Sequence, residues 1–593
     1  MEFFERTTGC GQITAEFVGK TITLCGWVQR RRDHGGLTFV DLRDRTGIMQ
    51  IVFSPEFSQK AHALAHEVRS EYVLSVTGVV VERIAGTVNK DLATGAFELQ
   101  VKDLTILNKA RTLPFALDDA DQVEEELRLV YRYLDLRRPL MHERIKMRHQ
   151  IVYAMREFFN AEGFYEIETP VLTKNTAEGA REFLVPSRIH KGSFYALPQS
   201  PQLYKQLLMA GGMERYFQIA RCFRDEDLRA DRQPEFTQLD IEMSFIKEGD
   251  IQSLIERLLK HLFKKLFNRD LQLPLQRMAY DDAYRLYGCD KPDLRFGLPI
   301  HDITSAFADT TLSFMKAVLD KGGKVGALHV NGHQFTRSEL EHWVSTALKN
   351  GAKGLVWIKF GENGSVEAPI AKFLPADFKA RIESIVGTVN AGDTIFLIAS
   401  TYKEAWAQLG KLRLQIAHEL KMIPHDQMKL LWVTDFPLLE YDEDSKRWQS
   451  VHHPFTRPQD GWEKLEPAQI KARSYDIVLN GVELGGGSIR IHEPELQKRI
   501  FDYLGFDEEA MRSHFGFLFD AQELGFPPHG GIALGIDRFV MLLLGCASIR
   551  DVIAFPKTQS MVDPMMHAPT PVAASKLKDY DLEYKPTIKE EKK

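Results

Sequence analysis

The sequence predicts an α+β protein of several domains, in which an N-terminal β-barrel precedes an antiparallel sheet flanked by helices. The 593 residues exceed the roughly 250–300 residues at which a single core stops growing. Short segments of alternating apolar residues fill residues 1–110, and Asn480-Gly481 joins two more as a hairpin turn. The pattern breaks off between about 293 and 420, which indicates an inserted domain.

The composition is that of an ordinary globular protein, with 44% hydrophobic and 27% charged residues. The formal net charge of −6 repels phosphate slightly, so nucleic-acid binding requires a local basic patch. The five cysteines include no CxxC pair, which disfavours a zinc site or disulfide framework and fits a reducing cytoplasm. No signal peptide is visible, and no stretch approaches the ~20 apolar residues of a membrane span. We therefore expect a cytoplasmic protein that makes no membrane contact.

Residues 1–110 are predicted to form five strands and one helix. The strands span Thr21–Trp27, Thr38–Leu42, Ile48–Phe53, Tyr72–Val81 and Phe97–Leu107. The helix, near Gln59–Arg69, follows the third strand. This order is typical of the OB-fold, a barrel whose open face binds single-stranded nucleic acid.

The rest of the chain divides where its composition changes. Residues 111–138 are predicted to be a linker, and residues 139–292 begin a second domain with a helix from Met141 to Asn160. Residues 293–420 form an inserted α+β domain whose sequence indicates no chemistry. Residues 421–567 complete the second domain, and residues 568–593 are a polar tail, expected to be poorly ordered.

Two predicted strands, 217–224 and 235–243, are joined by a loop rich in Arg and Asp. Antiparallel pairing places Arg224, Glu226 and Phe236 on one surface of the sheet. Arginine offers a bidentate fork for a phosphate, and an aromatic ring offers a flat face for a base. These residues predict a nucleotide platform without a glycine loop; the alternative is a surface hairpin held by salt bridges.

Two carboxylates are predicted to meet at the hairpin around Asn480-Gly481. Pairing across this turn places Glu483 opposite Val478, and Asp476 shares the face of Val478. Diagonal neighbours on one face can share a cation, and two carboxylates beside phosphates suit Mg²⁺. The alternative is an exposed hairpin with two solvated carboxylates. Gly485–Gly487 favour the cation site, since such a run weakens a strand unless another body approaches its backbone closely.

Two further arginines are candidate ligand contacts. Arg490 follows the glycine run and is either an ordinary ion-pair partner or a bidentate contact for a carboxylate substrate. Arg538 stands at the start of an apolar helix, directly after the bend at Gly535. The helix dipole disfavours a cation at that position, so we expect Arg538 to contact a ligand.

The basic run Arg30-Arg31-Arg32 is the candidate nucleic-acid contact. It is predicted to lie between the first two barrel strands and on their face. Arginines bind phosphates there, Phe39 stacks on an unstacked base, and Gln50 reads a base edge. A solvated charged face is the alternative; the barrel and its aromatic residue favour binding.

Together these segments resemble the motifs of bacterial-type, aspartate-specific class II aminoacyl-tRNA synthetases. Residues 217–243 resemble motif 2, and residues 530–543 resemble motif 3. The helix 141–160 with the strand ending at Pro170 resembles motif 1, a dimer-interface element. The resemblance implies an anticodon-binding barrel, a class II catalytic sheet, a homodimer, and ATP, Mg²⁺, L-aspartate and tRNA as substrates or partners.

The resemblance also implies roles for individual residues. Arg224 contacts the α-phosphate and the aspartate α-carboxylate, Arg490 reads the side-chain carboxylate, and Arg538 lies across the adenine from Phe236. A buried arginine facing a neutral amide loses its charge partner, so such a site can reject asparagine by ~10⁴.

The implied catalytic residues are Arg224, Glu226 and Arg538. The implied aspartate contacts are Glu178, Gln202, Lys205, Arg224, Asp240, His452 and Arg490. The implied ATP contacts are Arg224, Asp225, Glu226, Gln233, Phe236, Glu483, Gly535, Ile536, Asp537 and Arg538, and the implied metal ligands are Asp476 and Glu483. The implied anticodon contacts are Arg30, Arg32, His34, Phe39, Gln50 and Gly86.

The reaction implied is ATP-dependent formation of aspartyl-adenylate, followed by transfer to the 3′ end of tRNA-Asp. Relaxed members of the family often carry His after the Arg-Arg-Arg-Asp run and Gly-Thr near 86–87. This chain has His34 and Gly86-Thr87, which predicts that tRNA-Asn is recognised as well. One alternative is a strictly tRNA-Asp-specific enzyme. More remote alternatives are a tRNA-independent aspartate–ammonia ligase, disfavoured by the barrel, and a non-catalytic tRNA-binding paralogue, disfavoured by the intact Arg224 and Glu483.

Overall fold

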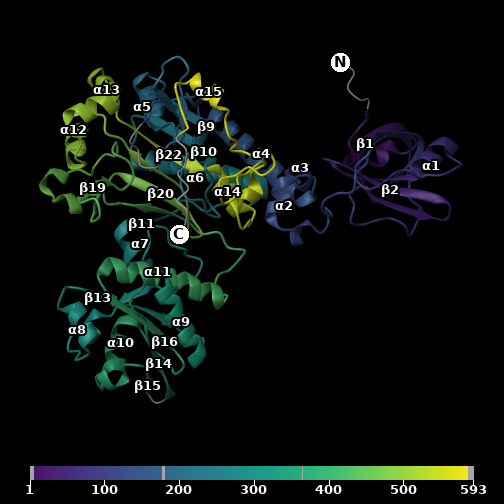
Figure 1. Ribbon diagram of the computed structural model, residues 1–593. Helices are drawn as coiled ribbons and strands as arrows, with labels where there is room; N and C mark the ends of the chain where they lie inside the picture. Colours follow the sequence, from purple (N-terminus) through teal and green to yellow (C-terminus); the bar gives the residue numbers. More distant parts are fainter. Residues whose placement is uncertain (1–5, 176–180, 363–364, 585–593) are drawn as a thin grey trace, which may run out of the picture. The chain divides into compact units, whose positions relative to one another are not determined.

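The computed structural model describes residues 6–175, 181–362 and 365–584. Two compact units make up the chain, residues 1–143 and residues 144–593. Figure 1 colours both along the sequence, with the first unit in purple and blue. Within the described ranges, no helix is long and apolar enough to cross a membrane.

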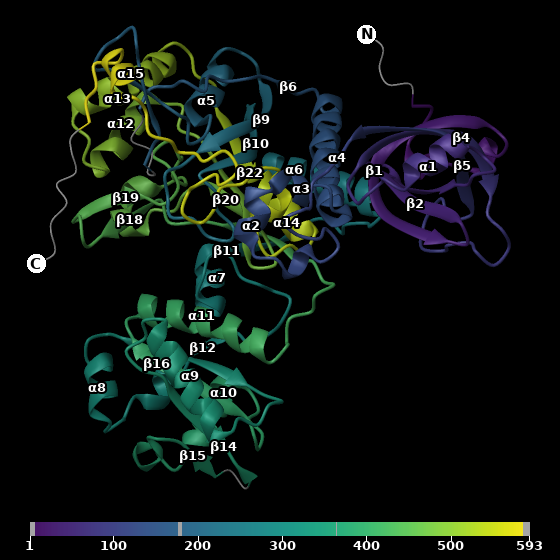
Figure 2. The same ribbon diagram turned by 45° about the vertical axis from the view of Figure 1, so that its right-hand side comes forward.

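The first unit contains a closed barrel with strand order β1-β2-β3-β5-β4, as predicted (Figure 2). Its elements are β1 (Thr21–His34), β2 (Leu37–Asp44), β3 (Gly47–Phe53), α1 (Gln59–Ala65), β4 (Val73–Glu82) and β5 (Phe97–Asn108). Alternate residues point inward, so that Leu24, Val40 and Leu42 are fully buried in one core. β1 continues past Trp27 to His34, so the basic run is part of the strand itself and does not lie between two strands.

The segment predicted to be a linker, residues 111–138, is folded. It contains a 3-10 turn (Ala120–Gln122), α2 (Glu125–Val130) and α3 (Arg132–Asp135). Asp135 is fully buried and accepts hydrogen bonds from Arg132 (2.6 Å) and Arg138 (2.9 Å), because an unpaired carboxylate would be costly there. The described part of the predicted tail is likewise not structureless, since it includes α15 (Ala574–Lys578).

The second unit is built on an eight-stranded sheet with strand order β11-β17-β20-β21-β22-β10-β9-β6. Its strands are β6 (Tyr165–Glu166), β9 (Arg215–Phe223), β10 (Glu235–Ser244), β11 (Gln276–Ala279), β17 (Leu430–Thr434), β20 (Ser474–Leu479), β21 (Val482–Ile489) and β22 (His529–Gly535). The pairs at the two edges are parallel and the others antiparallel. β6 ends at Glu166, so the strand predicted to reach Pro170 is shorter than expected.

Helices cover one face of this sheet and enclose its core. α4 (Pro139–Ala161), α6 (Glu248–Phe267) and α14 (Ile536–Leu543) contribute Met155, Leu258 and Val540 to a cluster with Ile477 and Leu534 of the sheet. The remaining helices of this unit outside the insertion are α5 (Gln202–Ala210), α7 (Tyr280–Tyr287), α12 (Pro494–Tyr503) and α13 (Glu508–Glu523). Two small hairpins, β7 (Leu184–Pro186) with β8 (Phe194–Ala196) and β18 (Leu439–Asp442) with β19 (Arg447–Ser450), complete it. The other face of the sheet is thereby available for polar side chains.

The predicted hairpin between β20 and β21 has the expected register at its turn, with Val478 opposite Glu483. A β-bulge then follows, so that Asp476 pairs with Gly486. A Cβ on Gly485 would lie 2.1 Å from the carbonyl oxygen of Ala533 on β22. At Gly485, therefore, the neighbouring strand β22 is what approaches the glycine backbone closely.

Residues 293–420 contain a separate five-stranded sheet with order β12-β13-β16-β14-β15. Its elements are β12 (Ile300–Asp302), α8 (Ser313–Leu319), β13 (Lys324–Val330), α9 (Arg337–Lys349), β14 (Val356–Phe360), β15 (Val366–Glu367), α10 (Phe378–Val386), β16 (Thr394–Ser400) and α11 (Tyr402–Glu419). Separate apolar clusters cover its two faces, one with α9 and α11 and the other with α8 and α10. The predicted strands near 326, 355 and 394 are present. The domain boundaries at 293 and 420 stay predictions, because the compact units do not divide there.

Candidate active site

A cavity of about 360 Å³ lies on the polar face of the eight-stranded sheet. Segments far apart in the chain line it: the β9–β10 loop, β10, the start of α5, the β20–β21 hairpin and the start of α14. Of the residues predicted for the amino acid, ATP and metal, it brings together Gln202, Lys205, Arg224, Glu226, Gln233, Phe236, Asp240, His452, Asp476, Glu483, Arg490, Gly535, Asp537 and Arg538. Asp225 and Ile536 do not line it, and Glu178 lies outside the described residues.

The nucleotide platform is formed by Phe236 on β10 and Arg224 just after β9. The guanidinium carbon of Arg224 lies 5.1 Å from the centroid of the Phe236 ring, in a cation–π contact. The buried Nε of Arg224 has no hydrogen-bond partner within the described part of the chain, so it is available to a ligand. Arg538 also lines the cavity and donates to the carbonyl oxygen of Glu483 at 2.9 Å.

Other predicted ATP contacts have protein partners of their own. Glu226 pairs with Arg232 at 2.9 Å, and Gln233 exchanges hydrogen bonds with the backbone of Lys557. The backbone N–H of Asp225 donates to the carbonyl oxygen of Arg181 at 3.0 Å. Ile536 is fully buried in the core, so its side chain cannot reach the cavity.

Asp537 also differs from the expectation of a free ATP contact. Its carboxylate accepts a hydrogen bond from the backbone N–H of Thr237 at 2.7 Å, and it pairs with Arg148. These contacts connect α14, β10 and α4. Asp537 therefore holds the platform in place, and its contact with ATP stays a prediction.

The two predicted metal ligands, Asp476 and Glu483, share the cavity. Burial and the charge of Asp476 raise the pKa of Glu483, although Arg538 partly counters them. A Cβ on Gly486 would lie 2.4 Å from Oδ1 of Asp476, so any larger residue at this position would displace the carboxylate. Two carboxylates that line one cavity fit a divalent cation that keeps its other ligands from water and phosphate. The described residues contain no cluster of three or more His, Cys, Asp or Glu side chains suited to a metal.

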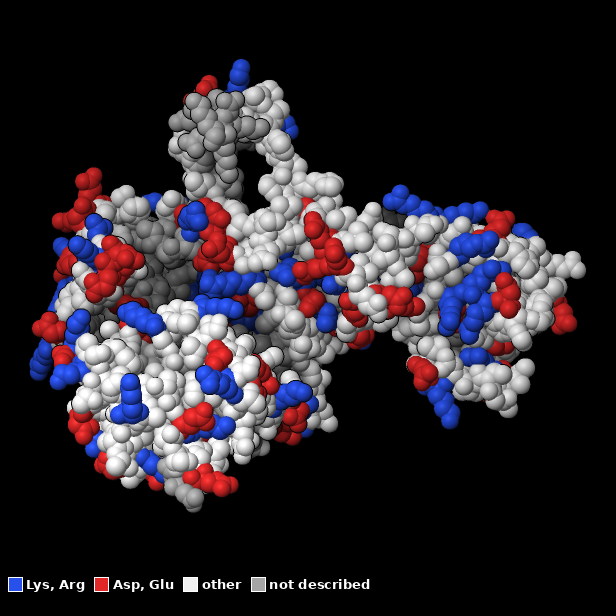
Figure 3. All heavy atoms as spheres, turned by 60° about the horizontal axis from the view of Figure 1, so that its bottom comes forward, with Lys and Arg blue, Asp and Glu red and all other residues white. Residues whose placement is uncertain are grey.

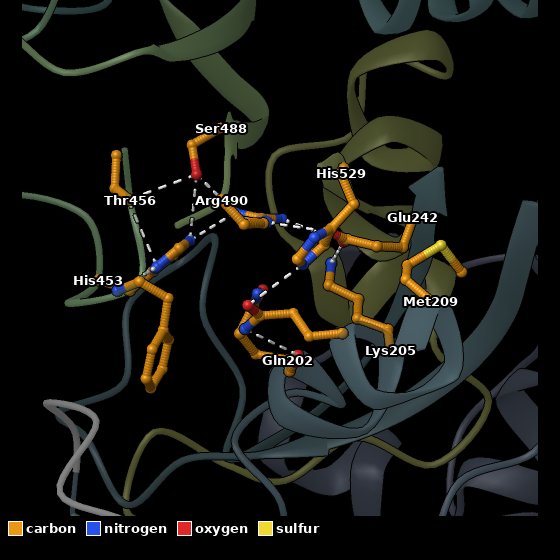
Figure 4. Close-up of polar contacts among 12 residues, drawn as sticks. Gln202, Lys205, Met209, Glu242, His453, Thr456, Ser488, Arg490 and His529 are labelled. Atoms are coloured by element: carbon orange, nitrogen blue, oxygen red, sulfur yellow. Dashed lines mark hydrogen bonds and ion pairs between the residues drawn. The ribbon is translucent and has the colours of Figure 1, made fainter. Parts of the chain in front are cut away.

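The amino-acid side of the cavity is a buried cluster of charges, of which Figure 4 labels Lys205, Glu242 and Arg490. Lys205 donates to Asp240 at 3.0 Å and lies 3.4 Å from Glu242. Arg490 binds Glu242 bidentately, through Nε at 2.9 Å and Nη2 at 3.2 Å. All four side chains are at most 2% exposed, so two cations and two anions neutralise one another away from water.

Burial affects the two carboxylates of this cluster differently. It raises the pKa of Asp240, and the ion pair with Lys205 only partly offsets this. For Glu242, the charges of Arg490 and Lys205 outweigh burial and lower the pKa. Glu242 is therefore the fixed anion of the cluster. Sequence reasoning named Asp240 and missed Glu242, although residues two apart on one strand share a face.

Both histidines of the pair His452-His453 line the cavity, with different partners. His452 Nε2 lies 3.3 Å from Oδ1 of Asp476. Burial alone would lower the pKa of His452, but Asp476 and Glu483 raise it overall. Arg490 Nη1 donates to Nε2 of His453, and burial together with this cation lowers the pKa of His453 well below its usual range. The expectation that His452 is the one to touch aspartate stays a prediction.

The predicted anticodon contacts lie mostly on one outer face of the barrel. Arg32 on β1 pairs with Phe39 on β2, and Gln50 on β3 is opposite Asp41. Arg32 donates to Asp41 at 3.1 Å, and Arg30 and His34 are exposed on the same strand. Figure 3 shows Lys and Arg side chains gathered on the barrel, at the right of the view. Gly86 lies in the loop between β4 and β5, at φ +91°.

Comparisons with known proteins agree with this architecture. The family described as "tRNA synthetases class II (D, K and N)" matches residues 124–559, and the family described as "OB-fold nucleic acid binding domain" matches residues 22–107. "Aspartate--tRNA(Asp/Asn) ligase" of Geobacillus sp. (strain WCH70) is 50% identical over 98% of each chain. "Aspartate--tRNA ligase" of Staphylococcus carnosus (strain TM300) is 50% identical over 98% of this chain and 99% of that protein.

A solved structure shows the same fold at greater evolutionary distance. It is the asparaginyl-tRNA synthetase from Pyrococcus horikoshii complexed with asparaginyl-adenylate, which is 19% identical with a TM-score of 0.60. The match covers 94% of this chain and 100% of that one. The chain belongs to the class II tRNA synthetases of the D, K and N group and, within them, to the family of aspartate–tRNA ligases.

Proposed function

We propose that the chain is an aspartate–tRNA ligase that forms aspartyl-adenylate from L-aspartate and ATP and transfers the aspartyl group to tRNA. One observation carries this proposal: the buried cations Arg490 and Lys205 open into the same cavity as the Arg224–Phe236 platform. A dicarboxylic amino acid and a nucleotide therefore fit side by side. The names of the relatives agree with this substrate pair.

The chemistry follows from positioning and charge. An oxygen of the aspartate α-carboxylate attacks the α-phosphorus of ATP, and pyrophosphate leaves. Arg224 neutralises charge on the α-phosphate and orients the attacking carboxylate, since a guanidinium can bind both anions. In the second step the 3′-terminal hydroxyl of tRNA attacks the adenylate carbonyl and AMP leaves. No protein nucleophile is needed, because the arrangement of the reactants supplies most of the rate.

We also propose that Asp476 and Glu483 hold Mg²⁺ in the working enzyme. Bound there, the ion would supply charge neutralisation between the triphosphate and the two carboxylates. Burial first, and then the charge of Asp476, raise the pKa of Glu483, which agrees with this assignment because a bound cation would stabilise both carboxylates.

The experiment that tests the function is pyrophosphate exchange with aspartate and asparagine side by side. We expect ATP–pyrophosphate exchange that depends on aspartate and is far weaker with asparagine. Absence of aspartate-dependent exchange by the folded protein would refute the proposal. An aspartate–ammonia ligase is not favoured, since the relatives match over nearly the full chain, barrel included.

We further propose that tRNA-Asn is charged as well as tRNA-Asp. The support is His34 and Gly86-Thr87 in the barrel and the names of several relatives, which include both tRNAs. Charging of the two purified tRNAs tests this directly. Comparable kcat/KM values are expected, and a strong preference for tRNA-Asp would contradict it.

A homodimer working in the cytoplasm is the assembly and location we propose. Tyr165 on the edge strand β6 is 63% exposed, and Tyr153 on α4 is 56% exposed. Large apolar side chains on an edge strand and a nearby helix are typical of a protein interface. Analytical ultracentrifugation should find two chains per particle, and a monomer at micromolar concentration would contradict the proposal.

A further inference from the structure

Behind the guanidinium of Arg490 lie two hydroxyl side chains, Ser488 and Thr456, that do not line the cavity. Ser488 Oγ accepts a hydrogen bond from Arg490 Nη1 at 2.6 Å, and it lies 3.3 Å from Thr456 Oγ1. Thr456 Oγ1 in turn lies 3.3 Å from Nδ1 of His453. Arg490 Nη1 donates to Nε2 of the same ring, so the four residues form the closed cycle visible in Figure 4. All four are buried or lie within the cavity wall.

Three of the four hydrogen-bond directions in this cycle follow from arginine, whereas either hydroxyl can donate between Ser488 and Thr456. A guanidinium only donates, so Ser488 Oγ and His453 Nε2 must both act as acceptors. A neutral imidazole carries one proton, which then sits on Nδ1 of His453 and points at Thr456 Oγ1. The low pKa of the ring agrees with a neutral imidazole.

The hydroxyl of Thr456 supports the tautomer of His453 that the contact with Arg490 requires. The backbone N–H of Phe455 also points at Nδ1, at 3.3 Å, and by itself would favour a ring with no proton there. That tautomer would carry its proton on Nε2 and direct it at the N–H groups of Arg490. By accepting the proton of Nδ1, the Thr456 hydroxyl acts with Arg490 to offset this preference and keep Nε2 an acceptor.

The cycle determines what Arg490 presents to a substrate. Glu242 binds the Nε and Nη2 side of the guanidinium, and Ser488 and His453 bind Nη1. These contacts use four of the five N–H groups of the guanidinium, so one N–H of Nη2 is left for a ligand in the cavity. A side-chain carboxylate can accept from this donor in a charge-assisted hydrogen bond, which the neutral amide of asparagine cannot form.

We propose that Thr456 and Ser488 are positioning residues for amino-acid selection, which act by holding His453 and Arg490 in the arrangement that accepts a side-chain carboxylate. This inference rests on the proposed function and assigns to it two residues outside the cavity. It predicts that hydroxyl groups with no substrate contact affect aspartate binding and the preference for aspartate over asparagine. ATP binding, on the far side of the cavity, is expected to be independent of them.

The test is Ser488→Ala in aspartate-dependent pyrophosphate exchange. We expect the KM for aspartate to rise about ten- to hundredfold, which is the typical effect of losing a hydrogen bond to a charged group. The preference for aspartate over asparagine should fall with it, while the KM for ATP stays within about twofold. Ser474→Ala is the matched control, because Ser474 is paired with Ser488 across the strands, and its buried hydroxyl has no partner in the described residues.

A second pair of variants separates hydroxyl chemistry from packing. Thr456→Val keeps the shape and removes the acceptor, and it should raise the KM for aspartate in the same way. Thr456→Ser restores the hydroxyl and should return the KM to near the wild-type value. This pair decides the question if Ser488→Ala fails to fold.

Two outcomes would overturn the inference. One is an unchanged KM for aspartate in a folded Ser488→Ala or Thr456→Val protein. The other is a Thr456→Ser variant as impaired as Thr456→Val, which would point to packing alone. Failure of the proposed function itself is distinguishable, because then the wild-type protein would show no aspartate-dependent exchange.

Discussion

Replacing Lys205 with methionine tests whether the buried charge cluster is balanced as the structure indicates. Lys205 and Arg490 face Asp240 and Glu242, and the four charges sum to zero. His529 beside them is neutral near pH 7, since burial lowers its pKa to about 4. Lys205→Met therefore leaves one uncompensated negative charge in the interior. Breaking a buried pair by removing one partner costs about 3–5 kcal/mol of unfolding free energy.

Adding Asp240→Asn to Lys205→Met should restore much of the lost unfolding free energy. In Lys205→Met/Asp240→Asn the cluster is neutral again, so we expect the double variant to be more stable than the single one. Lys264→Met is the matched control, because Lys264 pairs with Asp270 at 3.2 Å in an exposed position. Exposed pairs contribute about 0–1 kcal/mol, so this control should unfold almost like the wild type.

The single variant should also depend on pH in a defined direction. Burial already raises the pKa of Asp240, and loss of Lys205 raises it further. Between the unfolded pKa, about 3.9, and the raised folded value, the folded state binds the proton more tightly, so unfolding free energy falls as pH rises. The difference in unfolding free energy between the wild type and Lys205→Met should therefore become smaller as pH is lowered from 7 toward 5.

Urea unfolding followed by tryptophan fluorescence measures the loss of stability in Lys205→Met, its recovery in the double variant and its dependence on pH. Trp432 reports on these changes because it lies in the core of the same sheet. Aspartate binding should be lost in both Lys205 variants, because the cation that meets the substrate is gone. A Lys205→Met protein within about 1 kcal/mol of the wild type at pH 7 would refute the reasoning, given the cost expected for an unpaired buried charge. So would a double variant no more stable than the single one.

Three further predictions concern ATP, the cation and tRNA. Phe236→Leu removes the aromatic face under Arg224, and the KM for ATP in the exchange assay should rise about five- to hundredfold, since stacking on a base contributes ~1–3 kcal/mol; an unchanged KM would mean that the base lies elsewhere. Gly486→Ala displaces the carboxylate of Asp476, so the Mg²⁺ concentration giving half-maximal exchange should rise while denaturant stability changes little; equal Mg²⁺ dependence would argue against Asp476 as a ligand. Arg32→Ala should weaken tRNA binding and reduce the slope of log K against log salt by about one, as for a single phosphate contact; an unchanged slope in filter binding would place Arg32 outside the tRNA contact.

Local features of the sequence predicted a large part of the fold. The alternation of apolar residues predicts the barrel strands and the inward position of side chains such as Leu24 and Val40, because successive side chains on a strand point to opposite faces. The Asn480-Gly481 turn predicts the register of its hairpin, and Val478 is indeed opposite Glu483. Those relations span a few residues and depend only on backbone geometry.

The parts that sequence reasoning missed depend on segments that are distant in the chain. The family resemblance named Asp240 but did not show that Glu242, two residues on, meets Arg490 across 248 positions. The bulge between Ile477 and Val478 places Asp476 opposite Gly486, and no residue of the turn indicates this bulge. The hydrogen bond that Asp537 accepts from the backbone of Thr237, 300 positions away, could not be read from the sequence either.

The sequence by itself determined which residue types stand on which face of each strand, and hence that arginines, carboxylates and an aromatic ring were available for a nucleotide and an acidic amino acid. Only the tertiary structure decided which of them meet. Strand order and sheet packing bring α5, β10, β21 and β22 around one cavity, and burial there requires every charge to have a partner. The partners of Arg490 are therefore set by long-range packing, because a local pattern carries no information about which strand becomes its neighbour.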